Sequence, residues 1–188
     1  MTESFLMFTV GHSTRPLDRF LDILRAYGIR QVVDVRSIPR SRHNPQFDRV
    51  VLARFLRGRR INYRHMKGLG GLRHARRDSV NTGWVNASFR GFADYMQTPG
   101  FAAAIDTLMR IARRRRTVLM CAEAVPWRCH RSLIADALSL RAVEVRHILS
   151  ASSSRHHELT PFARVSGLKV TYPAEAAGRG LKTAAGTL

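Results

Sequence analysis

Lysine, cysteine and acidic side chains are all scarce in this chain of 188 residues. Lysine occurs only at Lys67, Lys169 and Lys182, so nearly all of the 32 basic residues are arginine, against 13 Asp and Glu. A formal net charge of +19 attracts anions, and we therefore expect an anionic ligand such as a nucleotide or nucleic acid. An arginine-rich composition also follows from a GC-rich genome, so charge alone defines no site.

The chain also lacks the features of secreted and membrane-spanning proteins. Its two cysteines, Cys121 and Cys129, are too few for a disulfide framework, which favours a reducing compartment. No stretch approaches the ~18 apolar residues of a membrane span, and the first residues lack the basic leader and apolar region of a signal peptide. We expect a cytoplasmic protein with no membrane partner, and the sequence leaves the oligomeric state open.

Apolar runs alternate with helical patterns, which predicts an α/β fold of three layers. The expected centre is a mostly parallel sheet of about five strands with flanking helices. Strands are predicted over residues 5–10, 31–35, 61–66, 117–120 and 143–149. Helices are predicted over residues 16–28, 46–58, 88–97, 99–113 and 127–140, with a further short helix and short strand within 155–173. Residues 1–173 then form one domain, and 174–188 form a disordered tail.

Reactive side chains follow the predicted strands, at the points where those strands end. Ligands of open parallel sheets bind beyond the carboxyl ends of the strands, so we expect these side chains to share one site. The predicted catalytic residues are Cys121, Glu123, Cys129, His130 and Asp34. The predicted substrate-binding residues are His12, Ser13, Thr14, Arg36, Arg131, Gly70 and Gly71.

The segment from Cys121 to Arg131 carries the densest group of these residues. A helix over 127–140 would place Cys129, His130 and Arg131 in its first turn, where free N–H groups bind anions. The same field lowers a thiol pKa and produces a nucleophile, while Arg131 is suited to a bidentate grip on phosphate or carboxylate. The alternative is that both cysteines serve only as small apolar packing residues.

A zinc site is a second alternative for the same segment. Its ligands would be Cys121, Cys129 and His130, together with His12 or Glu123. The spacing of these residues matches none of the standard zinc patterns. We therefore predict no metal ligands from the sequence, and no cofactor is indicated.

Two carboxylates, Asp34 and Glu123, stand among the arginines of this edge. They are suited to general acid/base catalysis, or alternatively to neutralising the surrounding guanidinium groups. A phosphatase-type loop is excluded, because the position six residues after Cys121 holds Trp127 and not arginine.

Five sequence motifs together resemble one known family, the domain of unknown function family 488. They are Thr9-Val-Gly-His-Ser-Thr14, Asp34-Val-Arg-Ser-Ile-Pro39, Leu69-Gly-Gly-Leu72, Cys121-Ala-Glu123 with Cys129-His-Arg131, and His157-Glu-Leu-Thr-Pro161. The resemblance runs from about residue 8 to about residue 173. It implies an α/β fold and a shared pocket at these positions, and it implies no particular activity.

Two functions from different classes are consistent with these observations. The first is an enzyme acting on a phosphate-containing substrate, a nucleotide or nucleic acid, at the carboxyl edge of the sheet. Arg36 and Arg131 would then hold the anion, and a cysteine or a carboxylate would carry the chemistry. The second is a nucleic-acid or nucleotide binding module without turnover, whose affinity would fall steeply with salt.

Overall fold

A six-stranded sheet forms the centre of the computed structural model, which describes residues 5–174. Its strands lie in the order β3-β2-β4-β1-β5-β6. They are β1 (Phe5–Gly11), β2 (Gln31–Asp34), β3 (Asn62–His65), β4 (Thr117–Cys121), β5 (Val143–Ile148) and β6 (Ser154–His156). Every pairing is parallel except that of β6, which runs antiparallel to β5 at one edge. The prediction of a mostly parallel central sheet is thus confirmed, with one antiparallel strand added.

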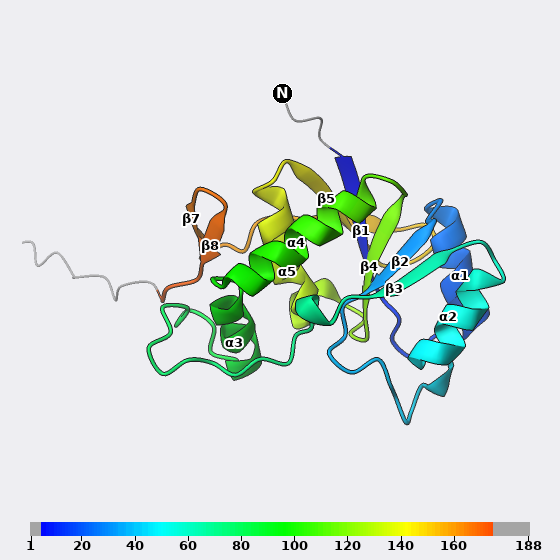
Figure 1. Ribbon diagram of the computed structural model, residues 1–188, viewed down its shortest axis with the longest axis horizontal. Helices are drawn as coiled ribbons and strands as arrows, with labels where there is room; N and C mark the ends of the chain where they lie inside the picture. The colour runs from blue at the N-terminus through cyan, green and yellow to red at the C-terminus, as the bar shows by residue number, and fades with distance from the viewer. Residues whose placement is uncertain (1–4, 175–188) are drawn as a thin grey trace, which may run out of the picture.

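Five α-helices among the described residues complete the three layers. They are α1 (Leu17–Ala26), α2 (Arg49–Arg57), α3 (Ala87–Tyr95), α4 (Pro99–Ala112) and α5 (Arg131–Ser139). Figure 1 shows α1 and α2 on one side of the sheet and α4 and α5 on the other. Within residues 5–174, no helix has the length and apolar character needed to cross a membrane.

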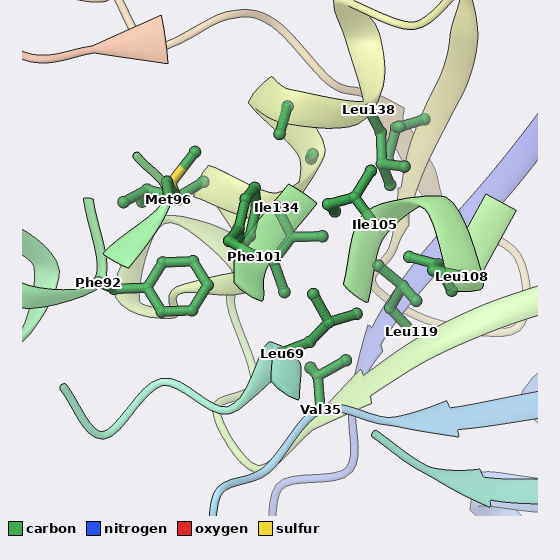
Figure 2. Close-up of a cluster of buried hydrophobic side chains, with 14 of the residues drawn as sticks. Val35, Leu69, Phe92, Met96, Phe101, Ile105, Leu108, Leu119, Ile134 and Leu138 are labelled. Atoms are coloured by element: carbon green, nitrogen blue, oxygen red, sulfur yellow. The ribbon is translucent and has the colours of Figure 1, made fainter. Parts of the chain in front are cut away.

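The amphipathic patterns of the sequence explain how the helices pack on the sheet. On α4, Phe101, Ile105 and Leu108 recur at helical spacing, and all three are buried. Figure 2 shows them facing Leu119 of β4 and Ile134 of α5, together with Leu69 and Phe92. The Thr98 side chain caps α4 by accepting from the Phe101 amide, as its position before Pro99 predicts.

The order of the strands creates a switch point at the centre of the sheet. Strands β1 and β4 are neighbours, but α1 leads from β1 towards β2, whereas α5 leads from β4 to β5 on the other side of β1. The two helices therefore leave the carboxyl edge in opposite directions, on opposite faces. Open α/β sheets bind ligands in the crevice that such a divergence leaves.

Two of the predicted helices begin later than the sequence indicates. Residues Pro45–Phe47 form a separate 3-10 turn, and α2 starts only at Arg49 after the extended residue Asp48. The side chain of Asn44 makes no capping bond. The break lets Phe47 turn inward, where it is fully buried and stacks on the His12 ring at 4.1 Å. Tertiary packing has overridden a local helix signal.

The second late start lies in the segment that carries the cysteines. Residues Pro126–Arg128 form a 3-10 turn, Cys129 is extended, and α5 begins at Arg131. The prediction that Cys129 lies in the first helical turn is therefore wrong. The thiol of Cys129 is placed by the extended residue before the helix, so the argument from the helix N-terminus does not apply to it.

Residues 155–173 contain strands where the sequence favoured a helix followed by a strand. Strand β6 is followed by the separate hairpin of β7 (Arg164–Ser166) and β8 (Lys169–Thr171). The segment is attached through polar side chains: Tyr172 Oη donates to the buried Asp136 carboxylate at 2.7 Å. The predicted tail begins at Ala174, whose amide donates to Thr82 Oγ1; its residues 175–188 lie outside the described part of the chain.

A buried histidine makes the fold acid-sensitive. The His147 ring lies between Thr9 Oγ1 at 2.7 Å and His157 Nδ1 at 2.9 Å. Burial lowers the pKa of His147 to about 3, and the neighbouring His157 and Arg131 act in the same direction. The unfolded chain, with a pKa of about 6.5 for this group, binds the proton that the folded chain excludes. The stabilisation is complete above pH 6.5 and is lost progressively as the pH falls towards 3.

We therefore expect the free energy of unfolding to drop by about 1–2 kcal/mol between pH 7.5 and pH 5. Urea titrations at several pH values in this range measure how steeply the free energy of unfolding falls with pH. His147→Gln, which retains hydrogen-bonding groups but does not titrate, should flatten it relative to the wild type. Coincident slopes for the two proteins would exclude His147 as the source. The comparison of variant with wild type removes the contribution of His12, whose pKa burial also lowers.

Candidate functional site

A cleft of about 660 Å³ opens at the switch point, at the carboxyl edge of β1, β2 and β4. We call it the rim cleft. Its walls come from the loops after these three strands, from the Gly71–Leu72 turn, and from the start of α3 at Ser88 and Phe89. Three guanidinium groups line it, those of Arg36, Arg40 and Arg128, and Glu123 is the only carboxylate among its lining residues. The rim cleft therefore has a net positive lining.

Backbone contacts hold the loops after β1 and β4 against each other. The amide of His12 donates to Cys121 O and that of Ser13 to Ala122 O, both at 2.9 Å. Ser13 has φ of 51°, an uncommon conformation for a residue other than glycine. A Cβ at Gly11 would overlap the Glu123 carbonyl. The close approach of the two loops thus depends on glycine at that position.

Arg36 is fixed in the floor of the rim cleft by Asp34. Its Nε and Nη2 donate to the Asp34 carboxylate, at 2.9 and 2.6 Å, and Tyr63 Oη donates to the same carboxylate at 2.6 Å. Asp34 is fully buried and does not line the cleft. The carboxylate is therefore engaged in orienting a cation, which is the second of the two roles that the sequence left open.

His12 is also held in one orientation. Its Nδ1 lies 2.7 Å from Ser13 O, and its Nε2 lies 3.2 Å from Arg36 Nη1. Because the carbonyl and the guanidinium require a donor at Nδ1 and an acceptor at Nε2, the ring is neutral and of defined tautomer. Burial chiefly lowers the pKa of His12, and the charge of Arg36 acts in the same direction.

Arg131 faces the protein interior and not the rim cleft. Its side chain is 1% exposed, and its two terminal nitrogens donate to Glu123 O at 2.6 Å and Ala124 O at 3.0 Å. The guanidinium thereby positions the loop that follows β4. In this geometry its observed role is to shape the wall of the cleft, and the sequence gives no signal that distinguishes this role from direct binding of an anion.

The two thiols meet at the edge of the rim cleft. Cys121 ends β4, Cys129 precedes α5, and both are free and buried. Their sulfur atoms and a ring nitrogen of His130 lie within 4.8 Å of one another. Hydrogen bonding from Cys129 lowers the pKa of Cys121 well below its usual range, and His130 and Arg131 act in the same direction. The pKa of Cys129 is raised by its hydrogen bond to Cys121 and by burial.

The His130 ring is oriented by two backbone carbonyls. Its Nε2 lies 3.1 Å from Val35 O and 3.0 Å from Leu69 O, so this nitrogen carries the proton and donates. The Nδ1 atom faces the thiol of Cys129, 3.7 Å from Sγ. A Cβ at Gly71 would lie 2.6 Å from His130 Cγ, so glycine at that position makes room for the ring.

Nine of the twelve residues predicted for the site line the rim cleft. They are His12, Ser13, Thr14, Arg36, Gly71, Cys121, Glu123, Cys129 and His130. The other three, Asp34, Gly70 and Arg131, lie behind it; a Cβ at Gly70 would meet Ser37 Oγ at 2.6 Å. Sequence reasoning missed Ser88, because the position of α3 beside the cleft leaves no local signal.

These features define a class: an open, mostly parallel α/β protein with a positively lined cleft at its switch point. The chain belongs to the family described as domain of unknown function DUF488, whose model matches residues 16–138. Three of the five motifs fall within the match, whereas those at 9–14 and 157–161 lie outside it. No curated protein and no solved structure matches the chain.

Proposed function

We propose that the protein is an enzyme acting on a phosphate-containing substrate, a nucleotide or nucleic acid, in the rim cleft. One observation carries the proposal: the Cys121–Cys129–His130 group lines the same cleft as three arginines. Reactive side chains and anion-binding side chains that converge on one cavity are the usual arrangement of a site that both holds and transforms an anion. The cytoplasmic location and the anionic partner remain predictions.

The arginines are suited to different parts of this task. Arg36 is buried and paired with Asp34, so its guanidinium keeps a constant position in the cleft floor. Arg40 and Arg128 are exposed, and their planar guanidinium groups are free to form bidentate bonds with phosphate. The apolar walls from Ile38, Leu72 and Phe89 fit the uncharged part of a nucleotide.

Glu123 is the acid/base candidate of the rim cleft. It is exposed in the loop between β4 and α5, whereas Asp34 is engaged by Arg36 and Tyr63. A positioned general acid or base contributes about 10²–10⁴-fold to a rate. In the proposed enzyme Glu123 serves as the general acid or base. The substrate binds beside the group formed by Cys121, Cys129 and His130.

The test is a turnover screen with nucleotides, oligonucleotides and other phosphate esters. Glu123→Gln should lower kcat by about 10²-fold or more while leaving the fold intact. Arg128→Ala should raise KM, because it removes a group that binds the phosphate. Arg110→Ala, which removes an exposed arginine from the far end of α4, is the matched control and should leave both constants unchanged.

Two results would overturn the assignment. The first is full activity of Glu123→Gln, which would exclude the proton-transfer role. The second is salt-sensitive binding of oligonucleotides without turnover of any phosphate ester, which would identify a binding module instead. Circular dichroism and urea unfolding of each variant separate loss of function from loss of fold.

A further inference from the structure

We propose that Cys121, Cys129 and His130 form a three-ligand site for a thiolate-preferring divalent metal ion of the zinc type. The inference does not depend on the enzymatic proposal, because metal binding is measured without turnover. It reverses the expectation from the sequence, in which the spacing of these residues matched no standard zinc pattern. The reasons lie in the tertiary arrangement of the three donor atoms.

The first reason is distance. Zinc is bound at about 2.3 Å by sulfur and about 2.0–2.1 Å by imidazole nitrogen, so tetrahedral ligand atoms are separated by about 3.5–3.8 Å. Cys129 Sγ and His130 Nδ1 are 3.7 Å apart, and all three donor atoms lie within 4.8 Å of one another. Small rotations of the side chains suffice to close such a group around an ion.

The second reason is the orientation of the His130 ring. A metal-binding imidazole must present an unprotonated nitrogen, and the other nitrogen commonly donates to a backbone carbonyl that fixes the tautomer. In His130, Nε2 is directed at Val35 O and Leu69 O, which leaves Nδ1, facing Cys129, as the nitrogen available to an ion. The ring is further held edge-on by Phe92, with centroids 4.9 Å apart.

The third reason is the chemical balance of the site. Two thiolates neutralise a divalent ion, and thiolate with imidazole selects zinc over magnesium or calcium, which prefer oxygen ligands. The two cysteines reach each other although they are separated by the loop that Arg131 supports through Glu123 O. A loop held in this way offers a preformed site, which reduces the entropy lost on binding.

The fourth position of the tetrahedron faces the rim cleft. All three ligands line the cleft, and neither His12 nor Glu123 belongs to the group of donor atoms within 4.8 Å. Three protein ligands with an open position are the pattern of catalytic zinc, whereas structural zinc has four. An ion placed there would polarise an oxygen atom of a phosphate held by the arginines.

The test is metal content and ligand spectroscopy of the whole chain. The protein is purified under reducing conditions, stripped with a chelator and reloaded with Zn²⁺ or Co²⁺. We expect about one ion per chain, and for Co²⁺ the strong thiolate charge-transfer and tetrahedral d–d absorption bands. In the loaded protein both thiols should resist alkylation, and the chelator should restore their reaction.

Variants assign the ligands. Cys121→Ser, Cys129→Ser and His130→Gln should each weaken the affinity for Zn²⁺ by at least about 10²-fold, whereas His74→Gln, at an exposed histidine in the loop before α3, should leave it unchanged. Variants at buried positions can misfold. The Co²⁺ spectrum of the wild-type protein therefore tests thiolate ligation without relying on them. Substoichiometric metal after reloading, or a Co²⁺ spectrum without thiolate bands, would overturn the proposal.

Turnover adds a separate result. If metal binds but no phosphate ester is converted, the metal site stands and the enzymatic proposal falls. If turnover occurs in chelator-stripped protein at the full rate and no metal binds, the metal site falls and the enzymatic proposal stands. The two proposals can therefore fail independently.

Discussion

Asp136→Ala is expected to destabilise the protein by about 3–5 kcal/mol, the largest stability change that we predict. Asp136 is fully buried on α5 and accepts four hydrogen bonds. The donors are His157 Nε2 at 2.9 Å, the Thr160 amide at 3.1 Å, Thr160 Oγ1 at 2.7 Å and Tyr172 Oη at 2.7 Å. Alanine would leave these groups without an acceptor, each at a cost of about 1–3 kcal/mol where it stays buried.

The same contacts give the His157-Glu-Leu-Thr-Pro161 motif a structural role. Two of its side chains, those of His157 and Thr160, bind the Asp136 carboxylate and hold the segment after β6 against α5. Asp136 is thus the common anchor of a stretch of chain that has little regular structure of its own.

Urea unfolding at pH 7.5 measures the effect of Asp136→Ala. Asp22→Ala, at an exposed position on α1, is the matched control and should stay within about 0.5 kcal/mol of the wild type. Tyr172→Phe removes one donor and leaves the carboxylate with three, so it should cost about 1 kcal/mol. An Asp136→Ala protein within 1 kcal/mol of the wild type would show that water replaces the lost acceptor.

Gly71→Ala is expected to disable the functional site. The added methyl group would lie 2.6 Å from His130 Cγ and 2.9 Å from Cε1, so the ring must move. Movement takes Nε2 away from the Val35 and Leu69 carbonyls and takes Nδ1 away from Cys129. We expect Zn²⁺ affinity and any turnover to fall by about 10²-fold, and stability by about 1–3 kcal/mol from overpacking.

The matched control for this variant is Gly100→Ala. A Cβ at Gly100 would meet its nearest neighbour, Tyr95 Oη, at 3.7 Å, an ordinary contact. Because Gly100 lies in the first turn of α4, alanine there should leave the protein as stable as the wild type, or more stable by up to about 1 kcal/mol. Metal titration and urea unfolding of both variants measure the contrast. Unchanged metal affinity in Gly71→Ala would show that the position of His130 is not required.

The α/β fold was predictable because its signals are local. Continuous apolar strands such as β4, the apolar stripe of α4 and the cap at Thr98 all lie within short stretches of sequence. Gly28, where the helix predicted over residues 16–28 ends, has φ of +62° just after α1. The sequence predicted one short strand within 155–173, but not the edge pairing of β6 or the hairpin of β7 and β8, since these pairings depend on partners and on turns with weak signals.

The sequence by itself determined the alternation of strands and helices over residues 5–149, and therefore the edge at which Cys121, Glu123 and His130 would gather. It did not determine what each side chain does there. Arg131 and Arg36 are both arginines that follow strands. Arg131 donates to a carbonyl of the loop after β4, whereas Arg36 lies in the floor of the cleft. Only the tertiary structure decided this, because orientation depends on partners that are distant in sequence. The His130 tautomer likewise depends on carbonyls 61 and 95 residues away.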